Sequence, residues 1–221
     1  MIGIRQRAET RADQPGGSPS GPVLLAPLRA EVAAVRLGAP GLRVERVGMG
    51  PARAEAARAR LARSLPPGAP LAVVGFAAGL SATDRPGDVV VADELVTLDG
   101  SRPPAVLDGE LAEQLRRALA PRLGGRVRTG RIACARKIVS AGATAASGAA
   151  AGALACEMES AWLAPLAERG RFAVARVLVD KPGRGIVSPF TIIGGAVAWR
   201  RLATVAAVLA DELPRAARPE L

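Results

Sequence analysis

The sequence contains no histidine and no tyrosine, and it has only two cysteines, Cys134 and Cys156. Without histidine the chain cannot form a Ser-His-Asp triad, a histidine-activated thiol nucleophile or a histidine-ligated metal site. Two isolated cysteines cannot build a four-ligand zinc site, and a secreted disulfide framework normally carries more, so we expect both thiols to be reduced. Acid–base chemistry must therefore come from Asp, Glu, Lys or Cys side chains.

Long apolar runs are also missing. No run reaches the ~20 apolar residues of a membrane-spanning helix, and residues 1–21 lack the apolar core of a signal peptide. We therefore expect a cytoplasmic protein without an integral membrane segment. Hydrophobic residues still make up 49% of the 221 residues, which is enough for one large core.

Lysine and aromatic residues are scarce although the chain is basic, with a net charge of +10. Lysine occurs only at Lys137 and Lys181, and the arginines are spread along the whole sequence. Aromatic residues, at 2%, are too few to stack single-stranded bases. We expect no nucleic acid as the main partner; salt-sensitive binding to arbitrary DNA would support that alternative.

Apolar patterning predicts strands that alternate with helices. The expected strands cover residues 23–26, 42–47, 71–76, 89–92, 127–133 and 172–179, and the expected helices cover residues 29–37, 52–65, 108–119, 158–169 and about 195–213. This alternation favours an α/β fold with helices on both faces of a mainly parallel or mixed sheet. We expect a flexible leader over residues 1–21, one domain over residues 22–214 and a tail over residues 215–221.

Two carboxylates stand after predicted strands, where α/β sheets usually bind ligands. Glu31 can hold a water molecule as a general base, or it can complement the dipole of the helix that begins there. Asp180 ends an apolar strand. Burial would raise the pKa of its carboxyl and let it protonate a leaving group, whereas an aspartate here also commonly starts a turn.

A second group of candidates lies at the start of the helix predicted near residue 158. Glu157 or Glu159 can accept two hydrogen bonds from the vicinal hydroxyls of a ribose, and Met158 can pack on the sugar. Helix-dipole complementarity explains the same glutamates without any ligand. The neighbouring Cys156 has no histidine to activate it, so we expect no nucleophilic role for its thiol.

Phosphate-binding fingerprints are absent. The chain has no Gly-x-Gly-x-x-Gly motif and no loop ending in Gly-Lys-Ser/Thr. We expect no cofactor, and the lack of histidine with only two isolated cysteines leads us to expect no metal site. The segment Gly48-Met49-Gly50 lies between a strand and a helix. It either lets a ligand approach the backbone and the helix N-terminus or forms a tight turn only.

Taken in order, these segments resemble the purine nucleoside phosphorylase/nucleosidase superfamily, which includes the methylthioadenosine/S-adenosylhomocysteine nucleosidases. The resemblance runs from about Val23 to Leu213, and its most specific element is Glu-Met-Glu at residues 157–159. The other matching segments are Pro27-Leu28-Arg29-Ala30-Glu31, Gly48-Met49-Gly50-Pro51-Ala52, Val74 to Leu80, Gly87 to Asp93 and Val177-Leu178-Val179-Asp180. It implies a three-layer fold around a twisted mixed sheet, and an enzyme that acts on a purine nucleoside.

The resemblance also implies a role for each candidate residue. Asp180 would protonate the departing purine, Glu31 would position or deprotonate the attacking water, and Glu159 would hold the ribose hydroxyls. The other implied substrate-binding residues are Glu157, Met158, Phe76, Ala77, Gly79, Ile138 and Val139. Ile138 and Val139 belong to a stretch that contacts the base partly through its backbone.

One departure from the family pattern bears on the reaction. Phosphorylases of the trimeric or hexameric type carry Arg-x-Gly-Ser where this chain has Val73-Val74-Gly75-Phe76. We therefore expect hydrolysis, with phosphorolysis as the alternative. Phe76 also lacks a hydroxyl that relatives place near the sugar, which keeps a non-catalytic nucleoside-binding protein as a further alternative.

A closer resemblance is to the hopanoid-associated members, which act on adenosylhopane. It is carried by the compact length and by the segments Gly152 to Ala161 and Arg85 to Asp88. The expected substrate is a 5′-substituted adenosine such as adenosylhopane, which would yield adenine and ribosylhopane; methylthioadenosine and futalosine are alternatives. An apolar substituent would suit Phe190-Thr191-Ile192-Ile193 as an apolar mouth, with transient contact to a membrane surface. Family members form dimers or larger assemblies, so we expect a homo-oligomer.

Overall fold

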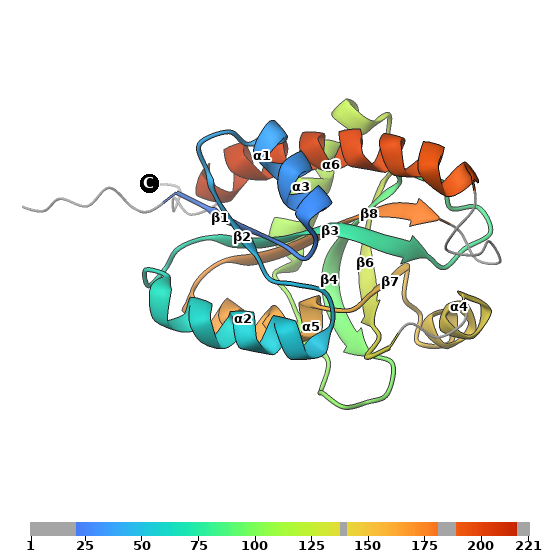
Figure 1. Cartoon of the computed structure of the whole chain (residues 1–221), viewed down its shortest axis with the longest axis horizontal. Helices are drawn as coiled ribbons and strands as arrows, with labels where there is room; N and C mark the ends of the chain where they lie inside the picture. The colour runs from blue at the N-terminus through green and yellow to red at the C-terminus, as the bar shows by residue number, and fades with distance from the viewer. Residues whose placement is uncertain (1–20, 138–140, 181–188, 216–221) are drawn as a thin grey trace, which may run out of the picture.

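The computed structural model describes residues 21–137, 141–180 and 189–215. Within these ranges eight strands form one sheet, and helices cover both of its faces (Figure 1). The strands are β1 (Val23–Ala26), β2 (Arg43–Arg46), β3 (Leu71–Gly79), β4 (Val89–Thr97), β5 (Ala105–Val106), β6 (Val127–Cys134), β7 (Ala155–Glu157) and β8 (Phe172–Asp180). The helices are α1 (Arg29–Gly38), α2 (Pro51–Ser64), α3 (Gly109–Leu119), α4 (Ala141–Ala150), α5 (Ser160–Leu163) and α6 (Pro189–Arg215), with short 3-10 helices η1 (Pro121–Leu123) and η2 (Ala164–Arg169).

The sheet is mixed. Its strand order is β2-β1-β3-β7-β6-β4-β5, and β8 pairs with both β3 and β4. The pairs β1–β2, β1–β3, β3–β8, β4–β6 and β6–β7 are parallel, whereas β3–β7, β4–β8 and β4–β5 are antiparallel. The pairings β3–β8–β4–β6–β7–β3 close a ring, so the sheet is rolled up at its centre. The predicted mixed sheet with helices on both faces is confirmed.

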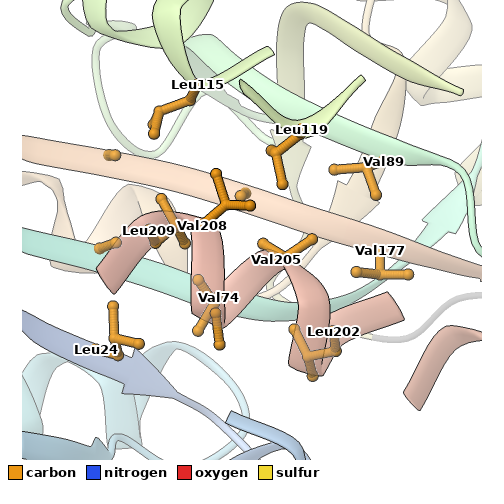
Figure 2. Close-up of a cluster of buried hydrophobic side chains, with 14 of the residues drawn as sticks. Leu24, Val74, Val89, Leu115, Leu119, Val177, Leu202, Val205, Val208 and Leu209 are labelled. Atoms are coloured by element: carbon orange, nitrogen blue, oxygen red, sulfur yellow. The ribbon is translucent and has the colours of Figure 1, made fainter. Parts of the chain in front are cut away.

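Two apolar cores lie on the two sides of the sheet. Helices α1, α3 and α6 cover one face, and α2 with α5 covers the other (Figure 1). Figure 2 shows the first core, where leucines and valines of α3 and α6 meet strand residues such as Val74 and Val177. Successive side chains of β3 alternate, so Val74 belongs to this core and Val73 to the other. Burial on both faces explains why β3 is a nearly continuous apolar run.

Helix starts follow the expected local signals. Helix α2 begins with Pro51 in its first turn, directly after the turn at Gly48 and Gly50, where both glycines have positive φ. Helix α3 is capped by Asp108, whose carboxylate accepts a hydrogen bond from the Leu111 N–H at 2.9 Å. Both helices begin within one residue of the starts predicted from the sequence.

The segment around residues 155–169 differs from the prediction of one helix over residues 158–169. Strand β7 runs to Glu157, and the following turn of α5 ends at Leu163 before η2 begins. Pro165 has no N–H to donate, so it cannot continue the α-helical hydrogen-bond pattern. The closing helix also begins earlier than expected, at Pro189, and the short strand β5 was not predicted.

Helices α1 and α6 approach each other closely at Gly38. A Cβ atom at this position would lie 1.8 Å from the carbonyl oxygen of Ala203, so only glycine allows the contact. Among the described residues, α6 and the other helices are not both long enough and apolar enough to cross a membrane.

We expect Gly38→Ala to lower the free energy of unfolding by about 2 kcal/mol, because the added methyl group must push the two helices apart. Gly109→Ala is the matched control, since a Cβ there meets nothing within 4 Å. Urea denaturation of the three proteins measures the difference. A Gly38→Ala midpoint equal to that of the parent would contradict the close approach.

Candidate functional site

A cluster of buried charged side chains lies where the ends of several strands and the start of α1 converge. Its centre is Arg176 of β8, whose side chain is fully buried. Around it stand three buried glutamates: Glu31 from α1, Glu157 from β7 and Glu159 from the turn before α5. We call these four residues the carboxylate cluster. It places three carboxylates around one guanidinium in a region that little water reaches.

Glu31 joins the first turn of α1 to strand β3. Its Oε2 accepts a hydrogen bond from the Leu28 N–H at 2.6 Å, which satisfies a free donor at the helix start. Its Oε1 accepts one from the Phe76 N–H, also at 2.6 Å. Burial raises the pKa of Glu31, while the nearby Arg176 charge and the two backbone donors oppose that rise. Each carboxylate oxygen keeps a second lone pair for a further donor.

Gly75 makes room for this arrangement. It pairs with Arg176 in the register of β3 and β8. A Cβ atom on Gly75 would lie 2.6 Å from Oε1 of Glu31 and 2.7 Å from Nη1 of Arg176. The missing side chain therefore brings the carboxylate and the guanidinium together over the same point of the sheet.

Glu159 reaches the turn before α2. Its Oε1 accepts a hydrogen bond from the Gly50 N–H at 2.8 Å, and its Oε2 lies 3.5 Å from Nη2 of Arg176. Burial and the neighbouring Glu157 charge raise the pKa of Glu159 to about 7, against the lowering effect of Arg176. Two candidates from the sequence, the turn at Gly48-Met49-Gly50 and the ribose-binding residue Glu159, are therefore in direct contact.

Glu157 is held by the protein itself. Its carboxylate accepts hydrogen bonds from the backbone N–H groups of Glu159 and Ser160 at 3.0 Å, and from the Ser160 hydroxyl at 3.1 Å. The Cys134 thiol, 2.7 Å away, and Nη2 of Arg176 are also donors. The two glutamates therefore turn in different directions, as their spacing of two residues allows.

Only one of the three guanidinium nitrogens of Arg176 has hydrogen-bond partners among the described residues. Its Nη2 donates to Glu157 and, at 2.9 Å, to the Ser160 hydroxyl. Its Nε and Nη1 have no hydrogen-bond partner among the described residues. Buried donors without partners are rare and costly, and a water molecule or a ligand commonly satisfies them. The side of the guanidinium that faces Gly75 and Glu31 is therefore the natural place for such a molecule.

The two thiols are poor nucleophiles. Both are buried. Burial and the Glu157 charge raise the pKa of Cys134, and they raise the pKa of Cys156 to about 12. Both side chains therefore remain protonated at neutral pH, in keeping with the expectation that Cys156 has no nucleophilic role.

The other predicted site residues fall into two groups. Met158 is half-buried beside the turn before α2, with its Cε 3.8 Å from the position of a Cβ on Gly50. Phe76 contributes its N–H to Glu31, whereas its side chain packs against the core under α1 and α6. Ala77 is buried in the opposite core, and Gly79 pairs with Ala155 of β7.

Three predicted residues lie partly or wholly outside the part of the chain that the structure describes. Asp180 ends β8, and its backbone lies opposite Ala78 of β3, so it stands at the strand ends near the cluster. Its side chain is not among those described. Ile138 and Val139, with the neighbouring Ser140, lie outside the described residues.

Arg176 is the residue that the sequence patterns missed. It lies within a strand that was recognised only for its apolar residues. A charged side chain inside such a strand almost always needs buried partners of opposite charge, and this signal could have linked β8 to the glutamates. Ser160, Cys134 and Gly75 carry no comparable signal, because residues of these types are common in any core.

A sequence model of the Phosphorylase superfamily matches residues 3–208. The chain belongs to this superfamily, since the match covers most of its 221 residues. The resemblance to nucleoside phosphorylases and nucleosidases is thereby confirmed, and so is the expected enzyme class, a nucleosidase or nucleoside phosphorylase. A search of curated proteins found no significant match.

Solved structures of 5′-methylthioadenosine/S-adenosylhomocysteine nucleosidases have a similar fold. The Helicobacter pylori enzyme, a mutant with 5′-methylthioadenosine in its active site, aligns with a TM-score of 0.70 and 15% identity over 88% of this chain and 99% of its own. The Neisseria meningitidis enzyme with methylthio-immucillin-A gives 0.71 and 19% over 89% and 99%. The Streptococcus pneumoniae enzyme with a transition-state inhibitor gives 0.72 and 20% over 86% and 98%. At these identities the likeness concerns the fold.

The raised pKa of Glu159 predicts a specific dependence of stability on pH. The native state keeps a proton on Glu159 up to about pH 7, whereas the unfolded chain loses it near the ordinary value of 4.5. The resulting stabilisation is complete below about pH 4.5 and is lost as the pH rises through about 7.

We therefore expect the free energy of unfolding of the parent to fall, relative to that of Glu159→Gln, by up to about 3 kcal/mol between pH 4 and pH 8. Urea denaturation across this range measures the difference. The exposed Glu110→Gln variant is the control. If the difference in unfolding free energy between the parent and Glu159→Gln stays constant with pH, then the environment of Glu159 does not raise its pKa.

Proposed function

We propose that this protein hydrolyses the N-glycosidic bond of a 5′-substituted adenosine. The observation that carries the proposal is the fully buried Arg176, placed between Glu31 and Glu159, with two nitrogens that find no hydrogen-bond partner in the described part of the chain. This arrangement offers a water molecule both donors and an acceptor. It offers a ribose an acceptor for its vicinal hydroxyls, and superfamily membership makes a nucleoside the fitting substrate.

The proposed reaction uses each group once. The bond between the ribose C1′ and the purine nitrogen breaks, and its electron pair leaves with the base. Asp180, at the end of β8, supplies the proton that makes the base a neutral leaving group. A water held by Glu31 and Nη1 of Arg176 adds its oxygen to C1′ and gives its proton to Glu31. The products are free base and the substituted ribose.

The cluster favours positive charge at the sugar. Its three carboxylates outnumber its one guanidinium. An oxocarbenium-like ribose bound beside them therefore gains electrostatic stabilisation. Glu159 would bind the two ribose hydroxyls, as a carboxylate can accept both, and Met158 would line the sugar. Phe76 serves the site through its N–H, so the side-chain hydroxyl that it lacks is not required for holding Glu31.

The same charges disfavour phosphate. A phosphate anion beside these carboxylates would be repelled, and Glu157 already balances the positive charge of Arg176 that could attract it. Val73, where phosphorylases of this kind carry an arginine, is fully buried in the core under α2. Water is therefore the better-matched nucleophile.

We expect the purified protein to release adenine from 5′-substituted adenosines at the same rate with and without phosphate. Asp180→Asn should lower kcat by at least about 100-fold, because the base must then leave unprotonated. Chromatographic detection of free base over a panel of nucleosides measures both. Strong stimulation by phosphate would instead indicate phosphorolysis, and no release from any nucleoside would indicate a binding protein.

The residues next to the cluster suggest an apolar 5′ substituent such as that of adenosylhopane. Leu28 and Met49 are two of the large apolar side chains that are exposed, at 39% and 44%. Leu28 precedes the helix that Glu31 caps, and Met49 precedes Gly50, the donor to Glu159. Both exposed side chains thus lie within a few residues of the proposed ribose site. Phe190 and Ile193, also expected at an apolar mouth, have side chains outside those described.

Replacing Leu28 and Met49 together by serine should lower kcat/KM for an apolar 5′-substituted adenosine by about 10-fold or more, with little effect on adenosine. The loss follows from the apolar contact area removed. Leu37→Ser is the control, because Leu37 is exposed at the other end of α1. Equal losses on both substrates would argue against an apolar subsite. Methylthioadenosine and futalosine belong in the same substrate panel.

The expected cytoplasmic location and homo-oligomeric state stay predictions. Size-exclusion chromatography with light scattering measures the oligomeric state directly, at several protein concentrations. Family membership motivates the expectation of a homo-oligomer.

A further inference from the structure

Glu157 occupies an unusual place among the three glutamates, because its carboxylate has no capacity left for a substrate. A carboxylate offers about four lone-pair sites. Five protein donors already point at Glu157: two backbone N–H groups, the Ser160 hydroxyl, the Cys134 thiol and Nη2 of Arg176. They come from β6, β8 and the start of α5, so the residue joins three elements.

These contacts fix the direction of the guanidinium of Arg176. Nη2 is held between Glu157 and the Ser160 hydroxyl, which in turn donates to Glu157. A planar guanidinium held at one nitrogen in this way keeps Nη1 and Nε pointing elsewhere. Nη1 then lies toward Gly75 and Glu31, where none of the residues that the structure describes accepts a hydrogen bond from it.

We propose that Glu157 is a positioning residue: it holds Arg176 by Nη2 so that Nη1 faces Glu31, and it keeps the guanidinium from moving closer to Glu159. This inference rests on the proposed function and assigns Glu157 to the support of the site in place of direct contact with the ribose. Without Glu157, the guanidinium would be free to turn toward Glu159, whose Oε2 is already 3.5 Å from Nη2. A shorter, hydrogen-bonded ion pair there would occupy the carboxylate that the ribose hydroxyls need.

The arrangement also has a charge consequence that can be measured. The charged and titratable groups around Glu159 are Glu31 from α1, Glu157 from β7 and Arg176 from β8. Burial and the Glu157 charge together raise the pKa of Glu159, and Arg176 opposes them. Removing the Glu157 charge should therefore lower the pKa of Glu159. A residue that only filled space would leave it unchanged.

Two substitutions separate charge from reach. Glu157→Gln keeps the size of the side chain and removes its charge. The carboxylate of Glu159 is the form proposed to bind the ribose hydroxyls, so its pKa should set the acidic limb of the pH profile of kcat/KM for base release. We expect this limb to move down by about one pH unit or more in Glu157→Gln. Glu157→Asp keeps the charge and withdraws the carboxylate by about 1.5 Å. We expect its kcat to fall by up to about 100-fold while the acidic limb stays in place.

Controls and a direct readout complete the test. Glu110→Gln, an exposed neutralisation, should match the parent in both measurements. Carbon-13 NMR titration of the Glu159 carboxyl in the parent and in Glu157→Gln reports its pKa without any turnover. Absence of base release by the parent would therefore defeat the proposed function, while the titration would still decide the inference.

The outcomes are distinct. A lowered Glu159 pKa in Glu157→Gln, together with a reduced kcat in Glu157→Asp, supports the positioning role. An unmoved Glu159 pKa, or a Glu157→Asp variant with parental kcat, overturns it. Should Glu157→Gln fail to fold by circular dichroism, the kcat of Glu157→Asp decides the question alone.

Discussion

The site depends on one buried guanidinium. Arg176 is fully enclosed, and removing such a group from water is costly unless anions and hydrogen bonds compensate. Glu157 and Ser160 provide that compensation on one side. Arg176 in return lets three glutamates lie close together, because without a central positive charge they would repel one another strongly. The glutamates and the arginine are therefore stable only as a set.

The fold supplies this set from distant parts of the chain. Strand β8 runs between β3 and β4, and this position carries Arg176 to the middle of the sheet. The parallel strands β1, β2, β3 and β8 present their carboxyl ends on one side, where loops contribute polar groups. The antiparallel strand β7 reaches the same place from the opposite direction and brings the Glu-Met-Glu segment. Closure of the ring of strands holds these contributions at fixed distances.

Much of this was predictable from the sequence, for physical reasons that apply to some segments and not to others. Strong apolar runs and a clear cap located β1, α2 and α3, because burial and capping act on neighbouring residues. The segment after β7 was harder, since Pro165 and tertiary contacts divide a stretch that looks helical. The partners of Arg176 are set by strand register, which no local pattern contains. The structure was therefore needed to recognise the carboxylate cluster as a unit, although its three glutamates were already candidates from the sequence.

Glu31 links the carboxylate cluster to the start of a helix. One oxygen of its carboxylate closes the first turn of α1, and the other reaches the backbone of β3. Helix α1 in turn packs on α6 at Gly38, so this single side chain connects the outer layer with the sheet. A substitution of Glu31 would therefore disturb the start of α1 and the proposed water site together. Without this carboxylate the Leu28 and Phe76 N–H groups would lose their acceptor, and the start of α1 would need another way to satisfy its free donor.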